Sequence, residues 1–276
     1  HAMHDLAHTH KKAWGTIGFI LLMGCLILMM YYTTVSGWLF AYTSDYMTGA
    51  FKGVHDASKY GEFFGKLVSS PVRSTISMAI VCIISGGVCA IGLKRGVESV
   101  VKVLMVALML LILVLAIYAM TLPNAAEGLK FYLLPNVDNF MKNPMETIFA
   151  AMGQAFFTLS IGIGSMEIFG SYLDWKTYLT KECIWIIALD TFVAFSSGLI
   201  IFPVCASNNI DVSAGPPLIF VSLPSVFATL PGGQFWGFLF FLFLLLAALT
   251  TVIAVFENLI AYPMDAKLMN RPASSV

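Results

Sequence analysis

The segment from Gly153 to Gly164 combines oxygen-bearing and helix-weakening residues within one apolar stretch of the chain. Thr158 and Ser160 carry hydroxyl groups, and Gly162 and Gly164 weaken a helix because they lack side chains. If the helix opens here, several carbonyl oxygens lose their intrahelical donors, which hydrocarbon tolerates only beside protein, water or a cation. The pattern fits a site for a monovalent cation and a ligand amine, or equally a notch where small residues pack against a neighbouring helix.

Two other apolar stretches carry oxygen-bearing residues at depth. Asp190 lies about nine residues inside its stretch, roughly 13 Å into a membrane by helical rise. A carboxylate at that depth is costly and usually has a cationic partner or a function, although a cytoplasmic vestibule could also hydrate it. Ala247, Thr250 and Thr251 share one helical face, with Val255 one turn further, and can offer oxygens to an ion. Taken alone, this stripe favours close helix packing.

The first apolar stretch contributes an aromatic hydroxyl. Leu28 and Tyr32 share a helical face, so the Tyr32 hydroxyl lies one turn beyond an apolar wall, unless it belongs to an interfacial aromatic belt. The five histidines, at positions 1, 4, 8, 10 and 55, all lie outside the apolar stretches. No span therefore offers the base that a serine protease needs, or a nitrogen ligand for a metal or haem. We predict that the protein is not an enzyme.

The composition identifies the setting of these residues. Of 276 residues, 59% are hydrophobic and only 11% are charged, the net charge is zero and the mean hydropathy is +0.86. Soluble domains are typically about 45–50% apolar and about 25% charged. The charge balance argues against a nucleic-acid partner, the 22 Phe against disorder, and the five Cys against a disulfide scaffold. The sequence therefore predicts an all-α, polytopic membrane protein in a lipid bilayer.

Six segments are candidates for spans, since crossing ~30 Å of hydrocarbon takes about 20 helical residues. They cover approximately residues 14–42, 72–93, 96–122, 147–173, 182–205 and 235–262. An even number of spans puts both termini on one side. Nine of the 15 Lys and Arg lie in the termini and the two short loops on that side, so both termini are expected to be cytoplasmic. Residues 211–233 hold a brief apolar stretch between prolines and glycines and predict an extracellular capping hairpin.

Several short strings of the sequence together resemble the neurotransmitter:sodium symporter family, especially its bacterial amino-acid transporters. These strings are Tyr31-Tyr32 with Gly37-Trp38, Gly153 to Gly164, Phe220-Val-Ser-Leu-Pro224, Pro231-Gly-Gly233 and Ala248-Leu-Thr-Thr251. The resemblance implies that the six spans are the third to eighth of about twelve helices, in an inverted-repeat fold with one helix broken in mid-membrane. It also implies a location in the bacterial inner membrane and further transporter helices outside this chain.

The resemblance assigns roles to individual positions. Phe157 is similar to an outer aromatic lid, and Tyr32 to the hydroxyl that contacts the substrate carboxylate. Further residues would line the substrate pocket: Leu28, Ser160, Ile163, Thr251 and Val255. Thr158 and Asp190 would bind one sodium ion, and Ala247, Thr250 and Thr251 would form half of a second sodium site. Tyr172 and Asp265 resemble members of a cytoplasmic gate.

The function that follows is sodium-coupled symport of an amino acid, expected to be hydrophobic, by alternating access. Chloride is not expected to take part, because Asp190 supplies the negative charge that chloride provides in chloride-dependent relatives. The chain alone is not expected to transport, since the missing helices would complete both sodium sites. A non-transporting membrane scaffold and a channel remain as alternatives.

Overall fold

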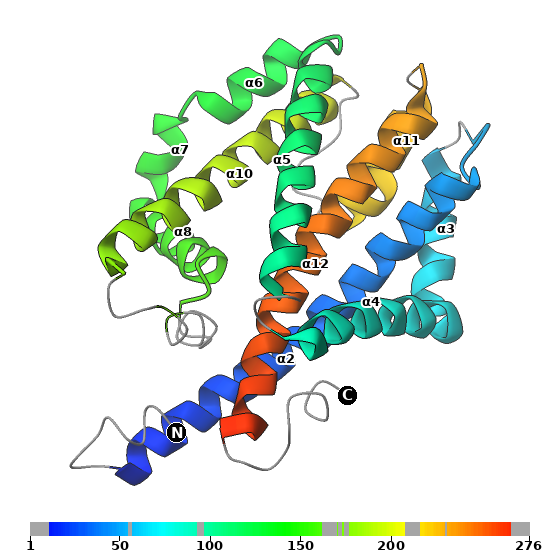
Figure 1. Cartoon of the computed structure of the whole chain (residues 1–276). Helices are drawn as coiled ribbons and strands as arrows, with labels where there is room; N and C mark the ends of the chain where they lie inside the picture. Colours follow the sequence, from blue (N-terminus) through cyan, green and yellow to red (C-terminus); the bar gives the residue numbers. More distant parts are fainter. Residues whose placement is uncertain are drawn as a thin grey trace.

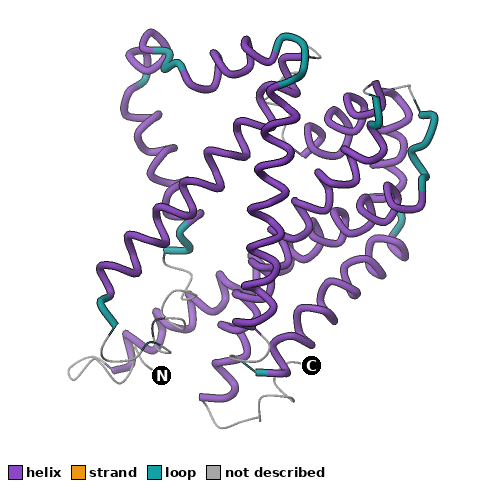
Figure 2. The backbone as a smooth tube through the Cα atoms, turned by 45° about the horizontal axis from the view of Figure 1, so that its top comes forward, coloured by secondary structure: helices purple, strands orange, loops and turns teal. Residues whose placement is uncertain are grey.

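The long apolar stretches of the sequence form long helices. The computed structural model describes residues 11–54, 57–92, 97–161, 170, 173, 177–207, 216–229 and 231–265, in which the regular structure is helical (Figures 1 and 2). Five of these helices are long and apolar enough to cross a membrane: α2 (Lys11–Thr48), α4 (Pro71–Ile91), α5 (Ser99–Met120), α10 (Leu179–Ser207) and α12 (Gly233–Asp265). The prediction of an all-α membrane protein is therefore confirmed, and the described residues contain five such spans where six were expected.

The difference lies in the predicted span over residues 147–173. Its described part forms α8 (Pro144–Thr158), and the helix ends in a turn at residues 159–161. At 15 residues α8 is too short to cross a bilayer, because each residue adds about 1.5 Å. Residues 162–169 lie outside the described part of the chain, so the expected continuation of the segment lies there as well.

Shorter helices occupy segments that were expected to be loops between the spans. They are α3 (Ala57–Ser69), α6 (Ala125–Leu133) and α7 (Val137–Lys142). In the predicted capping hairpin, the described residues form a short π-helical turn, η2 (Leu218–Ser222), followed by α11 (Leu223–Thr229). Hydrophobic residues at i, i+3, i+4 and i+7 of α3 face the rest of the molecule: Tyr60, Phe63, Phe64 and Leu67.

α2, α4 and α12 form the most closely packed part of the molecule. α4 crosses α2 at Gly37, where an added methyl group would lie 2.7 Å from the backbone nitrogen of Met78. Nearby, Trp38 Nε1 donates to Ser74 Oγ at 3.1 Å, and Arg73 donates to both carboxylate oxygens of Asp45 at 2.5 and 2.6 Å. The missing side chain of Gly37 therefore allows a close helix crossing, and polar contacts fix it.

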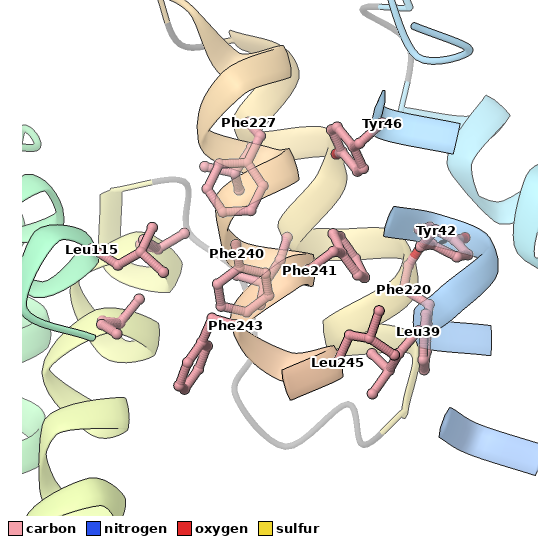
Figure 3. Close-up of a cluster of buried hydrophobic side chains, with 14 of the residues drawn as sticks. Leu39, Tyr42, Tyr46, Leu115, Phe220, Phe227, Phe240, Phe241, Phe243 and Leu245 are labelled. Atoms are coloured by element: carbon pink, nitrogen blue, oxygen red, sulfur yellow. Dashed lines mark hydrogen bonds between the residues drawn. The ribbon is translucent and has the colours of Figure 1, made fainter. Parts of the chain in front are cut away.

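Aromatic rings join η2 to the long helices α2 and α12 (Figure 3). The Tyr42 ring of α2 stacks on Phe241 of α12, with centroids 5.0 Å apart, and meets Phe220 of η2 edge-on at 5.2 Å. The Tyr42 hydroxyl also donates to the Phe220 carbonyl oxygen at 2.8 Å. From α3, Tyr60 donates to the Val54 carbonyl at 3.0 Å, and burial raises the pKa of Tyr60 to about 12. η2 is thus fastened to the carboxyl-terminal half of α2, and α3 to the loop that follows α2.

α6, α7, α8 and α10 lie on the opposite side of α5 and α12 from α3 and α4 (Figure 1). α5 packs against both α10 and α12 through buried residues at helical spacing, among them Leu108, Ile112 and Leu115. α6 packs on α10 with the Tyr132 ring stacked on Phe202 at 4.6 Å. The amino end of α2 and the carboxyl end of α12 lie at the same end of the bundle (Figure 1).

Candidate functional site

α8 ends in a capping arrangement that depends on the backbone of Ser160. The Ile161 N–H donates to the Phe156 carbonyl at 2.9 Å, and the Ser160 N–H donates to the Phe157 carbonyl at 3.1 Å. This pair of bonds is a Schellman motif, in which the residue after the C-cap adopts a left-handed conformation. Ser160 does so with φ 54. α8 therefore ends at Thr158.

The structure brings together two residues that the sequence analysis assigned to one ion site. The Thr158 hydroxyl donates to the Asp190 carboxylate, with distances of 3.0 Å to Oδ1 and 3.2 Å to Oδ2. Thr158 is the last residue of α8, and Asp190 lies within α10. A hydroxyl oxygen and a carboxylate thus meet at the end of a helix whose next residues leave the helical path.

A second group of oxygens lies on α12. The Ala247 carbonyl oxygen accepts a hydrogen bond from the Thr250 hydroxyl at 2.8 Å and lies 3.3 Å from the Thr251 hydroxyl. Both hydroxyls bond back to the preceding turn, a local contact available to threonine within a helix. Three oxygens therefore converge on one face of α12, as the i, i+3, i+4 spacing predicted.

An apolar wall joins α2 to α12 beside these oxygens. Cys25, Met29 and Val255 form a buried cluster, and Tyr32 packs against it. Tyr32 and Val255 were predicted to line the site, whereas Cys25 and Met29 were not. Cys25 lies about two turns and Met29 about one turn before Tyr32 on α2, and this spacing was the available signal. Leu28, also named, is half-buried on the same helix.

The structure gives less information on the remaining predicted site residues. Phe157 lies on α8 with 56% of its surface exposed. Ser160 lies in the turn that follows α8. Ile163 and Tyr172 lie outside the described residues, and Asp265 is the last residue of α12. The proposed gate therefore stays a prediction.

Two buried polar residues of α12 were not assigned to the site. Glu257 is 1% exposed, and Asn258 donates from Nδ2 to Cys25 Sγ at 3.5 Å. The pattern held a signal, because Thr250 and Glu257 are seven residues apart and share one face of a helix.

The chemistry of the two oxygen groups limits what they could bind. Each combines hydroxyl, carbonyl or carboxylate oxygens, which are hard donors suited to alkali and alkaline-earth cations. Within the described ranges, no three His, Cys, Asp or Glu side chains gather as a transition-metal site would require. The group at Thr158 carries one carboxylate, and the group on α12 carries no formal charge. This arrangement suits a monovalent cation.

Comparisons with known proteins give a consistent result. The model of the Sodium:neurotransmitter symporter family matches residues 64–271. The sodium-dependent transporter YhdH of Bacillus subtilis is 32% identical over 251 residues, which cover 91% of this chain and 55% of the relative. A sodium-dependent transporter of Haemophilus influenzae is 33% identical over 256 residues, with the same coverages of 91% and 55%.

A solved structure extends the similarity to the fold. The crystal structure of MhsT in complex with L-phenylalanine aligns with a TM-score of 0.85 and 33% sequence identity. The alignment covers 96% of this chain and 59% of that protein. The chain thus spans a little over half the length of the relatives it matches. With a family match over most of its length and this agreement in fold, the chain belongs to the Sodium:neurotransmitter symporter family of membrane transporters, and it is not an enzyme.

Proposed function

We propose that the whole protein carries a hydrophobic amino acid inward together with sodium by alternating access. The observation that carries the proposal is the contact between the Thr158 hydroxyl and the Asp190 carboxylate, at the point where α8 ends. A sodium ion at this position would receive the Asp190 charge and the Thr158 hydroxyl oxygen. The substrate carboxylate would complete its coordination, so ion and solute would stabilise one occluded state.

The second sodium ion in this proposal binds the oxygens of Ala247, Thr250 and Thr251. These oxygens lie close together on one face of the helix and would form one side of a coordination shell. The other side of both sites would come from segments beyond the part of the protein that this chain covers. We therefore expect the chain alone not to transport, and we expect both sodium sites to form only in the whole protein.

The substrate class follows from the wall between α2 and α12. Cys25, Met29 and Val255 form a buried apolar cluster, and Tyr32, half-buried against it, carries one hydroxyl suited to a carboxylate. A pocket that the whole protein completes beside this cluster would favour a hydrophobic side chain, with few polar groups to fix orientation. MhsT, the relative of known structure, was crystallised with L-phenylalanine. L-phenylalanine is accordingly the first substrate to test, with Phe157 as the outer lid and Tyr172 and Asp265 in the cytoplasmic gate.

The proposed orientation places both ends of the chain in the cytoplasm of a bacterial inner membrane. The higher density of Lys and Arg in the termini and in the two short loops supports this orientation. The amino end of α2 and the carboxyl end of α12 lie at one end of the bundle, as this orientation requires (Figure 1).

The test is a measurement of linkage between ion and solute in the purified whole protein. If both occupy one occluded state, sodium must lower the Kd for L-phenylalanine, and L-phenylalanine must lower the Kd for sodium by the same factor. Calorimetric titrations at several sodium concentrations, with potassium as the control ion, measure both. A Kd for L-phenylalanine that is independent of sodium would refute coupling and favour a scaffold or a channel.

Variants locate the site. Removing a partly buried carboxylate that balances a cation costs about 3–5 kcal/mol, so we expect Asp190→Ala to weaken sodium binding roughly 100-fold or more. Glu182→Gln, in the first turn of the same helix, is the matched control and should leave the sodium affinity unchanged. Replacing chloride with gluconate should also leave uptake unchanged in proteoliposomes. Equal loss in both variants, or uptake that stops without chloride, would contradict the role given to Asp190.

A further inference from the structure

A proline stands inside the continuous helical run that η2 and α11 form. η2 leads directly into α11, and Pro224 is the second residue of α11. In an α-helix, the N–H at this position would donate to the carbonyl oxygen of Phe220, four residues earlier. Proline has no N–H, and its ring crowds the carbonyl at that distance along the helix. The Phe220 carbonyl therefore receives no hydrogen bond from residue 224.

The hydrogen bonding of η2 agrees with the presence of the proline. The N–H of Leu223 donates to the carbonyl oxygen of Leu218, which is five residues earlier and not the usual four. Such wider π turns are rare, and they often occur at functional sites. This one comes directly before Pro224, so the helix widens at the place where the proline ring needs room.

The Tyr42 hydroxyl of α2 supplies a donor to the Phe220 carbonyl. The hydrogen bond is 2.8 Å long, and both residues are buried (Figure 3). A buried carbonyl without a donor is costly, because no water can take the place of the missing partner. A side chain of α2 thus provides what the backbone at Pro224 cannot.

Aromatic side chains hold the Phe220 ring independently of this bond. The ring stacks on Phe64 of α3, with centroids 5.0 Å apart, and meets Trp38 of α2 edge-on at 6.0 Å. The Tyr42 ring also contacts it edge-on, and a phenylalanine at position 42 would keep that contact. Removing the Tyr42 hydroxyl should therefore loosen η2 without removing the ring contacts that seat it.

We infer that Tyr42 is a positioning residue for η2 and α11, and that its hydroxyl replaces the N–H that Pro224 lacks and holds η2 closed against α2. Lifting η2 away from α2 must break this bond. The bond requires neither sodium nor a substrate. Its part in transport, as a contact that breaks when the outer end of the molecule opens, rests on the proposed function.

Two buried cysteines can report whether η2 and α11 lift. Cys205 lies near the carboxyl end of α10 and belongs to the same buried cluster as Phe220 and Leu223. α11 contacts α10, so Cys205 should react faster with N-ethylmaleimide when η2 and α11 lift. Cys89 of α4 is buried in a different cluster and reports general loosening of the protein.

The measurement is the alkylation rate of each cysteine in the purified whole protein, without sodium or substrate, followed by peptide mass spectrometry. Losing one net hydrogen bond changes an equilibrium roughly fivefold, so we expect Tyr42→Phe to speed alkylation of Cys205 roughly fivefold and to leave Cys89 unchanged. In Pro224→Ala the backbone regains an N–H for the Phe220 carbonyl. Adding Tyr42→Phe to that variant should change the Cys205 rate by less than about twofold.

Tyr60→Phe is the matched control. Tyr60 is also a buried phenol, but it donates to the Val54 carbonyl and not to η2. Its effect on the Cys205 rate should therefore be the same with and without Pro224→Ala. If Pro224→Ala does not fold, Pro224→Ser allows the same comparison, because any residue other than proline supplies the N–H.

The outcomes separate this inference from the proposed function. An unchanged Cys205 rate in Tyr42→Phe would overturn the inference, as would an effect of Tyr42→Phe that is equally large with and without the proline. Equal acceleration at Cys205 and Cys89 would also overturn it, because the protein would then be loosened as a whole. A wild-type protein whose substrate binding ignores sodium would refute the proposed function and leave the bond between Tyr42 and η2 standing.

Discussion

The two groups of oxygens lie in regions that are packed very differently. The α12 oxygens belong to a densely packed core, in which α2, α4 and α5 surround much of α12. The Thr158–Asp190 pair lies in an open region formed by α8 and the first half of α10. α8 has no buried residue, and the α10 residues from 179 to 195 are exposed or half-buried.

This difference indicates which part of the proposed site is held in place before any ion binds. On α12 the oxygens lie on a single helix and are joined by hydrogen bonds within it, so their spacing is fixed within this chain. At Asp190 and Thr158 the helices carrying the charge have little other support, and their relative position depends on that polar contact and on α5 and α6 behind α10. The geometry of the Thr158–Asp190 pair is therefore the part of the proposed site that movement or additional helices could adjust.

The largest effect is expected from filling the close crossing of α2 and α4. In Gly37→Ala, the new methyl group would lie 2.7 Å from the Met78 backbone nitrogen and 2.9 Å from its Cα. Because backbone atoms cannot turn aside as a side chain would, we expect overpacking to lower the free energy of unfolding by about 1–3 kcal/mol. Unfolding by denaturing detergent in mixed micelles measures the change.

The control for that prediction lies on the same helix. An added methyl group at Gly24 of α2 would have no heavy atom within 4 Å. Gly24→Ala should therefore leave the free energy of unfolding unchanged or raise it slightly, because alanine favours a helix over glycine. Equal losses at the two positions would mean that the crossing of α2 and α4 is looser than its geometry indicates.

A smaller loss of stability is expected from weakening the attachment of η2 to α2. Tyr42→Phe removes the buried bond from the Tyr42 hydroxyl to the Phe220 carbonyl and keeps the ring contacts. A bond of this kind contributes about 1 kcal/mol net, so the free energy of unfolding should fall by about that amount. Tyr31→Phe, on the exposed side of the same helix, should have no effect. If the two variants behave alike, the hydrogen bond does not fasten η2 to α2.

The sequence predicted the packed core better than the open region, for physical reasons. Hydropathy identifies long helices because membrane spans require about 20 apolar residues, and five of the six predicted segments contain such a helix. The i, i+3, i+4 spacing predicted that the oxygens of Ala247, Thr250 and Thr251 share one face of α12, because this spacing depends on helix geometry alone. The spacing of Tyr60, Phe63, Phe64 and Leu67 also predicts α3, although this helix is too short and too polar for hydropathy to identify it as a span.

Contacts between distant residues were beyond such patterns. Thr158 and Asp190 are 32 residues apart, and only the family resemblance indicated that they meet. The break in the fourth segment was expected from Thr158, Ser160, Gly162 and Gly164 together, and the described stop lies at Ser160. Composition could not indicate a left-handed serine, because that conformation is imposed by hydrogen bonds of the surrounding turn. The burial of Glu257 likewise depends on how α12 is surrounded, which depth along the helix does not reveal.

The smallest predicted effect tests the open region directly. Gly153 lies within α8, and an added methyl group there would meet no heavy atom within 4 Å. In the 276-residue chain, Gly153→Ala should raise the free energy of unfolding by roughly 0.5–1 kcal/mol, because alanine loses less backbone entropy than glycine in a helix. Gly65→Ala, at an equally open position of α3, calibrates that gain in the same assay. A matching gain at both positions would establish that the Gly153 face of α8 is free in this chain. A loss at Gly153 alone would mean that a neighbour already covers it, and the contrast between a packed core and an open, charged half-site would no longer hold.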